Sequence, residues 1–118
     1  CTASGRAFLS ALPEADALAL IRQGERVAHT RHTLTDESAI LEQLQLARQR
    51  GYAVNREELF LGDMTLAAPV VGGRGRPVAA VHVVAPTSRW TPEEAEKRLA
   101  PALIACARSL SNSVRALA

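Results

Sequence analysis

Hydrophobic positions recur every three or four residues in four stretches of the chain, and this spacing predicts four helices. The expected helices span residues 3–12, 12–24, 35–51 and 91–118. Typical boundary residues stand at their ends: Thr2 or Ser4 can cap the first helix, and Gly24 and Gly51 can end the next two. The last helix carries one apolar stripe, formed by Ala95, Leu99, Leu103, Cys106, Leu110, Val114 and Leu117.

The middle of the chain instead alternates with a period of two, which is typical of β-strands. The expected strands span residues 52–59, 64–71 and 77–85. Residues 72–76, "GGRGR", separate the last two strands and indicate a hairpin. Consecutive strands joined by short turns favour an antiparallel sheet, so the fold class is α+β with helices packed against the sheet.

The hairpin also suggests a strand register. A four-residue loop would pair Val71 with Arg76 and would set Thr65 opposite His82. Val84 would share the face of His82, because strand residues two apart point the same way. A histidine in such an apolar run lies beside a ligand pocket, is satisfied by one hydrogen bond, or faces solvent from an edge strand. The opposite face should be core and carries Met64, Leu66, Val81 and Val83.

Composition narrows the class of protein. A chain of 118 residues forms one small domain, and 47% hydrophobic residues suffice for a core. A net charge of +2 is too weak for an electrostatic nucleic-acid surface, and no apolar run approaches the roughly 20 residues of a membrane helix. Two cysteines do not make a disulfide framework, which favours a reduced, cytoplasmic setting. Because the sequence starts at Cys1, we expect an N-terminally incomplete piece of a longer polypeptide.

Catalytic groups are weakly indicated. Glu57 and Glu58 are adjacent and would point to opposite faces of a strand, so they cannot form a dyad and are expected to be a charged strand end. Ser4 lacks the G-x-S-x-G turn of a hydrolase nucleophile. A thiol–imidazole pair of Cys1 with His82 would need a third, orienting group. We therefore expect no catalytic residues.

Cofactor sites are also weakly indicated. His29 and His32 have an H-x-x-H spacing, but a metal site needs three or four ligands, so no metal is expected. The segment "GGRG" lacks the lysine of a phosphate-binding loop and leads into a strand. The start of the first helix is different, because its N–H groups around Ala3 and Ser4 favour a carboxylate or phosphate. If this start faces Thr65 and His82, a small organic acid could be held there.

Several segments, taken in order, resemble one family. They are "CTASGRAFLSALPEADALALI", "HTRHTLTDESAILEQLQLARQRGYAVNREE", "LAAPV", "VAAVHVVAPTSRWTPE" and "RLAPAL". Together they resemble the C-terminal effector-binding domain of IclR-type bacterial transcription regulators over nearly the whole chain. The shared pattern includes a Thr-x-x-Thr connector, "GYA-D-EE", a "G-x-x-C-x-A-x-P" strand and an "A-x-S-x-S-G-P" strand.

The resemblance implies a GAF-like fold, a pocket for a small organic acid, and assembly into dimers or tetramers. It also implies an N-terminal winged helix-turn-helix, absent from residues 1–118, through which the protein would contact DNA. The family's pocket positions fall on Ala3, Ser4, Asn55, Asp63, Thr65, His82 and Val84. Four of these residues depart from the family pattern. Asn55 stands where the family has an acid, Thr65 where it has a thiol, and His82 where it has a hydroxyl. Val84 stands where the family has a serine, so a polar group is lost. These changes suggest a larger acid, such as an aromatic one.

The expected function is therefore a ligand-sensing, oligomerising regulatory domain. An oligomerisation module with a degenerate pocket is the first alternative, and a cavity filled beside His82 would favour it. A small hydrolase or isomerase using His82 is the second, and it would need a base, a nucleophile and an oxyanion donor in reach of one another.

Overall fold

The computed structural model of the chain describes residues 2–117, so the Cys1–His82 pair considered above lies outside the described residues. The helices are α1 (Ala3–Ser10), α2 (Glu14–Gln23), α3 (Glu37–Arg50) and α4 (Pro92–Leu117), and the strands are β1 (Ala53–Arg56), β2 (Asp63–Val71) and β3 (Pro77–Pro86). The strands form an antiparallel sheet in the order β1-β2-β3. The predicted α+β class is confirmed.

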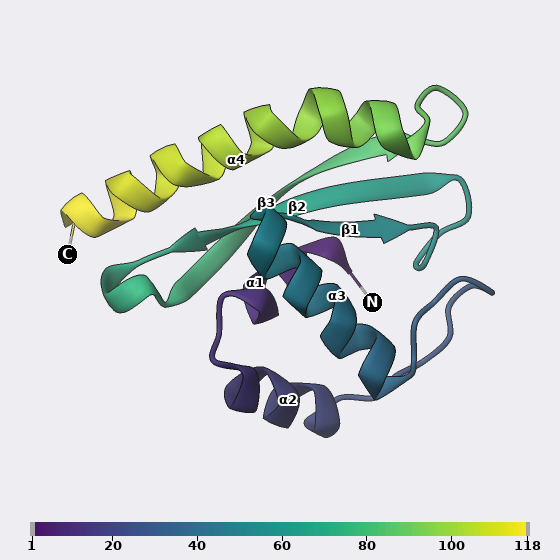
Figure 1. The fold of residues 1–118 in the computed structure, drawn as a ribbon, viewed down its shortest axis with the longest axis horizontal. Helices are drawn as coiled ribbons and strands as arrows, with labels where there is room; N and C mark the ends of the chain where they lie inside the picture. The colour runs from purple at the N-terminus through teal and green to yellow at the C-terminus, as the bar shows by residue number, and fades with distance from the viewer. Residues whose placement is uncertain (1, 118) are drawn as a thin grey trace.

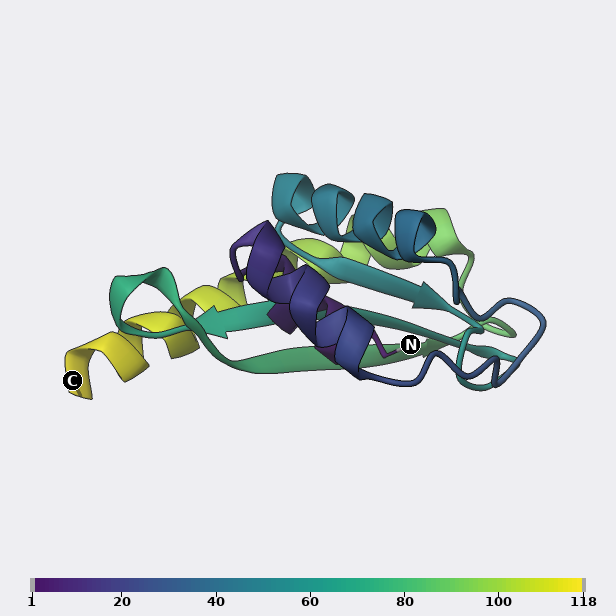
Figure 2. The ribbon, with the colours of Figure 1, turned by 90° about the horizontal axis from the view of Figure 1, so that it is seen from below.

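The elements form three layers. Helix α4 covers one face of the sheet, while α1 and α3 cover the other, as Figure 1 shows. Helix α2 lies outside this second layer, where Ala17 and Ile21 pack with Leu44 of α3 (Figure 2). The start of α1 therefore faces the sheet directly.

Local side-chain contacts explain where the helices begin and end. The Thr2 hydroxyl accepts the Gly5 N–H at 3.0 Å, so Thr2 and not Ser4 caps α1. Asp36 and Thr91 cap α3 and α4 in the same way. Gly51 ends α3 with φ +89°, a left-handed conformation that a residue with a Cβ rarely adopts. Thr2 thus determines where the first N–H groups of α1 lie.

The predicted hairpin register is wrong by two residues. Thr65 lies opposite Val84, and His82 lies opposite Ala67. The loop between β2 and β3 has five residues, Gly72–Arg76, and a bulge at Val70/Val71 adds one more on β3. The longer loop and the bulge each shift the register by one residue, and together they shift it by two. Because side chains alternate between faces, a shift of two residues leaves Thr65, His82 and Val84 on one face.

The face toward α4 holds the aliphatic core. Met64 and Leu66 of β2 are fully buried, and they pack in one cluster with Ala95, Ala100 and Leu103 of α4. The face toward α1 is lined by small residues instead: Ala3, Ala7, Ala47, Ala53 and Ala67 form its cluster. Alanines let α1 approach the sheet closely, and they leave space where larger side chains are absent.

Two expectations about the edges of this core need correction. The predicted strand 52–59 ends at Arg56, since Glu57 has φ +57° and turns the chain. Glu58 is buried and not a solvated strand end. The predicted stripe of α4 is buried at Ala95 and Leu103, but the others are half-buried or exposed: Leu99, Cys106, Leu110, Val114 and Leu117. The buried line of α4 runs through Ala95, Ala100, Leu103, Ala107 and Ser111.

Candidate functional site

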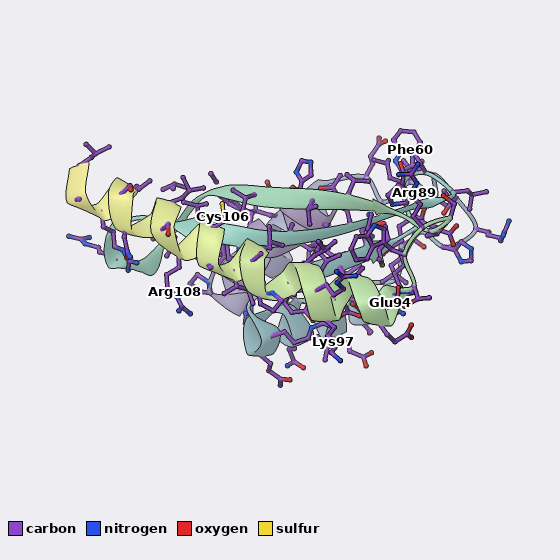
Figure 3. All side chains as sticks on the ribbon, turned by 90° about the horizontal axis from the view of Figure 1, so that it is seen from above. Phe60, Arg89, Glu94, Lys97, Cys106 and Arg108 are labelled. Atoms are coloured by element: carbon purple, nitrogen blue, oxygen red, sulfur yellow. The ribbon has the colours of Figure 1, made fainter. Side chains whose placement is uncertain are left out.

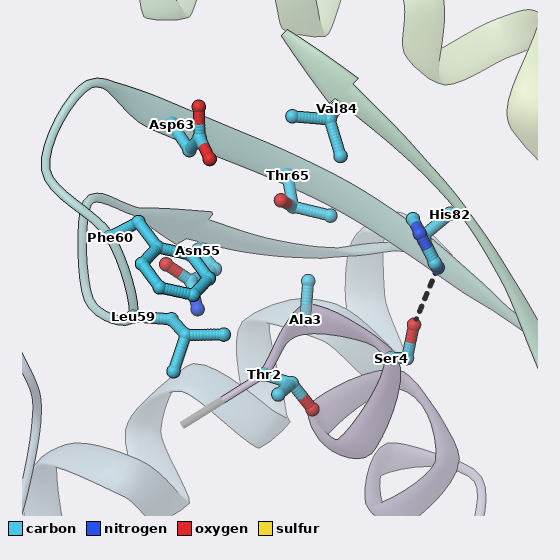
Figure 4. Close-up of a pocket in the computed structure, with 10 residues that line it drawn as sticks. All are labelled: Thr2, Ala3, Ser4, Asn55, Leu59, Phe60, Asp63, Thr65, His82 and Val84. Carbon is cyan, nitrogen blue, oxygen red and sulfur yellow. Dashed lines mark hydrogen bonds between the residues drawn. The ribbon is translucent and has the colours of Figure 1, made fainter. Parts of the chain in front are cut away.

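A cavity of about 320 Å³ opens between the start of α1, the loop from β1 to β2, and the α1-facing side of the sheet (Figure 4). All seven residues singled out in the sequence line it. Three further residues complete the lining, Thr2, Leu59 and Phe60. The fold thus brings together positions that are up to 81 residues apart along the chain, Ala3 and Val84. Their role in ligand binding stays a prediction.

The start of α1 forms one end of the cavity. Ala3 is buried against the sheet, and Ser4 follows it on the first turn. The Ser4 hydroxyl and Nδ1 of His82 are 3.1 Å apart and form a hydrogen bond (Figure 4). The Gly5 N–H of this first turn is accepted by the Thr2 hydroxyl, whereas the N–H groups of Ala3 and Ser4 have no acceptors within the helix. Hydrogen-bond donors therefore gather at this end, where they suit a carboxylate.

The strands supply the wall of the cavity. Thr65 of β2 is half-buried, and its cross-strand neighbour Val84 is 48% exposed. His82 is exposed on the same strand as Val84. This wall is open because β3 is the last strand on its side of the described sheet.

The loop from β1 to β2 supplies the opposite end. Asn55 is buried at its base, and its Oδ1 accepts the N–H of Glu58 at 3.0 Å. Phe60 has 63% of its surface exposed although its ring lines the cavity. Figure 3 places Phe60 at the end of the molecule remote from the C-terminal end of α4. Asp63 begins β2 beside this loop and adds a carboxylate at the mouth.

A buried ion pair supports that loop. Arg6 and Glu58 are each only 5% exposed, and the guanidinium donates to both carboxylate oxygens, once at 2.6 Å. Arg6 also donates to the carbonyl of Val54 at 3.1 Å, and Glu58 accepts the N–H of Leu34 at 3.1 Å. The pair therefore ties α1, β1 and the connector before α3 to the loop that carries Leu59 and Phe60.

The Thr-x-x-Thr connector belongs to the same network. The Thr30 hydroxyl donates to the carbonyl of Glu57 at 2.5 Å, and the Thr33 hydroxyl donates to the carbonyl of Glu58. The Thr33 hydroxyl in turn accepts the N–H of Thr30 at 2.9 Å. These contacts hold the backbone of the turn at Glu57 from outside the cavity, so the motif acts on the position of the loop.

Catalytic and metal chemistry find little support in this geometry. The Ser4–His82 contact is the first half of a nucleophile and base pair, but it uses Nδ1 of the imidazole, the nitrogen that an orienting carboxylate would hold. Within residues 2–117, no three His, Cys, Asp or Glu side chains come together as metal ligands. His32 lies 3.8 Å from the carboxylate of Glu57, and His29 is exposed. No helix in this described range is long and apolar enough to cross a bilayer.

Comparison with known proteins identifies the family. Residues 1–112 match the family described as "Bacterial transcriptional regulator IclR C-terminal". The chain belongs to the IclR family. It is 37% identical over 94 residues to the probable transcriptional regulator SauR of Cupriavidus necator, covering 80% of this chain and 37% of that protein. The predicted resemblance is confirmed. The family to which the chain belongs consists of transcription regulators and not of enzymes.

Two further matches carry the name of an aromatic acid in their own descriptions. The p-hydroxybenzoate hydroxylase transcriptional activator of Acinetobacter baylyi is 32% identical over 113 residues, covering 96% of this chain and 42% of that protein. The inducer-binding domain of PobR from Acinetobacter, solved as a double mutant with 3-hydroxybenzoic acid, superposes with a TM-score of 0.85 at 32% identity. That match covers 96% of this chain and 65% of the PobR chain. The chain spans about two fifths of the length of these curated relatives.

Sequence reasoning missed the site role of five residues in this IclR domain. Thr2, Leu59 and Phe60 line the cavity, and Arg6 and Glu58 hold the loop of Leu59 and Phe60. A signal for the pair exists, because two acids follow the buried strand and an arginine stands in the first apolar helix. This sequence pattern does not predict whether Glu57 or Glu58 turns inward, because that depends on the positive φ of Glu57.

Proposed function

We propose that this IclR-family domain senses a small organic acid, with an aromatic acid as the favoured class. The observation that carries the proposal is the cavity of about 320 Å³ between α1, β2 and β3. Donors gather at its α1 end, where Ser4 and His82 meet the first turn of the helix, and apolar side chains form much of the rest. Donors at one end and apolar walls elsewhere suit an acid with a carbon skeleton.

The ring of Phe60 and the side chains of Leu59 and Val84 support the aromatic class, because flat rings pack well against aromatic and aliphatic surfaces. The related PobR domain, solved with 3-hydroxybenzoic acid, supports the same class. An open cavity beside His82 favours sensing over a degenerate pocket. Each of these arguments concerns the lining, so each can be tested on single side chains.

In the proposed mechanism the acid shifts a population of conformations. It binds more tightly to one arrangement of the loop at Leu59 and Phe60, and the network of Arg6 and Glu58 carries this preference to the connector at Leu34. The regulator would act in the cytoplasm on an operator. A winged helix-turn-helix outside residues 1–118 would contact the DNA, and the effector would alter how two such units are spaced.

Thermal-shift measurements test the sensing function. We expect benzoate, hydroxybenzoates and short keto acids to be distinguishable by how far each raises the melting temperature of the chain, because binding to the native state stabilises it. His82→Ala should reduce the shift given by the best acid. His29→Ala is the matched control, since it removes an exposed imidazole outside the cavity.

Two results would overturn the assignment of the pocket. One is that no acid shifts the wild type. The other is that His82→Ala keeps every shift that the wild type and His29→Ala give.

Self-association is a second candidate function, alongside sensing. Apolar side chains are exposed at Val78 of β3 and at Leu110 and Leu117 of α4, and β3 ends the described sheet. Exposed apolar surface beside an open strand edge suits a dimer or tetramer contact. Light scattering after size-exclusion chromatography should show a larger species for the wild type and a smaller one for Leu110→Glu. A wild type that is monomeric at high concentration would refute this candidate.

A further inference from the structure

The cavity has two chemically opposite ends. Asp63 begins β2 opposite Pro86, and His82 lies opposite Ala67. Asp63 and Ala67 are four residues apart on one strand, so the two ends are separated by about 13 Å at roughly 3.3 Å per residue. Figure 4 shows Asp63 and His82 at opposite sides of the cavity, with Thr65 between them. A ligand that reaches both ends must therefore carry two polar groups.

The two ends of the cavity favour different hydrogen-bonding groups on a ligand. At the His82 end, the Ser4–His82 hydrogen bond uses one proton of this pair and leaves the other to donate, and the first turn of α1 adds N–H groups, which together suit a carboxylate. At the other end, the carboxylate oxygens of Asp63 accept hydrogen bonds. This carboxylate attracts a hydroxyl or amino group and repels a second carboxylate. Val84, opposite Thr65, lines the space between with apolar surface, and Phe60 adds an aromatic ring at the loop end.

We propose that the effector is an aromatic acid with a hydroxyl or amino group across the ring from its carboxylate, and that Asp63 selects this group. The inference rests on the proposed sensing function. A para-substituted ring acid is roughly 6–7 Å long between its outer heteroatoms, and two hydrogen bonds of about 2.8 Å extend this to roughly 12 Å. That length matches the separation of the two ends.

Asp63 also excludes competitors. A ring acid without a donor leaves the Asp63 carboxylate unmatched, and a para-dicarboxylate sets two negative charges against each other. The first loses a favourable contact and the second gains an unfavourable one. The order of affinity for the chain is therefore donor-bearing acid first, benzoate next, and dicarboxylate last.

Titration calorimetry with 4-hydroxybenzoate, 4-aminobenzoate, benzoate and terephthalate tests this order. On the wild type we expect 4-hydroxybenzoate or 4-aminobenzoate to bind about tenfold more tightly than benzoate, as one charge-assisted hydrogen bond gives. Asp63→Asn removes the negative charge and keeps the size. It should weaken that preference and raise the affinity for terephthalate about tenfold.

Asp16→Asn is the matched control, because Asp16 is an exposed acid on α2 that does not line the cavity. It should leave the order of the four acids unchanged. If the acids bind but Asp63→Asn leaves the ratio of terephthalate to 4-hydroxybenzoate affinity as in the wild type, the role of Asp63 is refuted and acid sensing stands. If none of the four acids binds the wild type, this inference fails; refuting sensing itself requires the keto acids to fail as well.

Discussion

The two faces of the sheet are built from the same strands but are stabilised differently. On the α4 face, Met64 and Leu66 are fully buried among aliphatic side chains of the long helix. On the α1 face, alanines bring the helix close, and a cavity remains beside Thr65. There the loop at Leu59 and Phe60 is held by the buried pair of Arg6 and Glu58. Aliphatic packing is thus concentrated on one face, and the buried ion pair and the space for a ligand on the other.

The largest effect on stability is expected at the buried Arg6–Glu58 ion pair on the α1 side of the sheet. Arg6→Met leaves the Glu58 carboxylate buried without its partner, which should lower the free energy of unfolding by about 3–5 kcal/mol. Urea denaturation followed by circular dichroism measures it. Arg22→Met, which breaks an exposed pair with Glu37, is the control and should change little. Equal effects of the two variants would contradict the distinction between buried and exposed pairs.

A slightly smaller loss is expected on the α4 face. Leu66→Ala should lower the free energy of unfolding by about 2–5 kcal/mol, because it removes buried carbon atoms and leaves a void. Thr65→Ala changes the next residue on the opposite face, beside an existing cavity, and should cost much less. The same denaturation experiment compares them. If both variants lose the same stability, the two faces are equally packed and the comparison is wrong.

Overfilling the α1 face separates its packed part from its empty part. Ala67→Leu inserts atoms where Ala67 is fully buried, so it should cost about 1–3 kcal/mol through overpacking. Thr65→Leu places its extra volume toward the cavity, so it should cost less and should abolish the melting-temperature shift given by organic acids. Scanning calorimetry with and without acid measures both. A Thr65→Leu variant that still responds to the acids would argue against this cavity as their site.

The smallest effect is expected in the pH dependence of stability, at Tyr52 on the edge of the α4 face. Burial, and next the hydrogen bond to Glu96 at 3.0 Å, raise the pKa of the Tyr52 phenol above its ordinary value of about 10. The folded state therefore keeps this proton at a pH where the unfolded chain loses it. The stabilising contribution is present below about pH 10 and is lost as the pH rises through the folded pKa.

Tyr52→Phe tests this by removing the titrating group and its hydrogen bond. Between about pH 9 and 11, the melting temperature of the wild type should fall slightly more steeply than that of the variant. Parallel curves would show that Tyr52 does not contribute to the pH dependence. Burial of Tyr52 is only partial, so this is the last and weakest measurement of the four.

Sequence patterns predicted the elements well for physical reasons that are local. Helix caps such as Thr2 and Thr91, and the left-handed Gly51, depend on neighbours a few residues away. The α+β class follows from the change of hydrophobic period along the chain. The positions that line the cavity could be anticipated from the family resemblance, and alternation along β3 sets His82 and Val84 on one face. Thr65 shares that face only because the longer loop and the bulge offset one another, so the wrong register did not change the face.

Only the tertiary structure decided how these parts fit together. The five-residue loop and the bulge at Val70/Val71 offset one another, and neither can be read from the spacing of hydrophobic residues. The inward turn of Glu58 depends on Arg6, which lies 52 residues earlier and makes burial of the charge tolerable. Leu59 and Phe60, which line the cavity, lie on the loop that this pair supports. The sequence by itself thus determined the elements and their faces, whereas long-range contacts decided the register, the buried charge pair and the shape of the cavity.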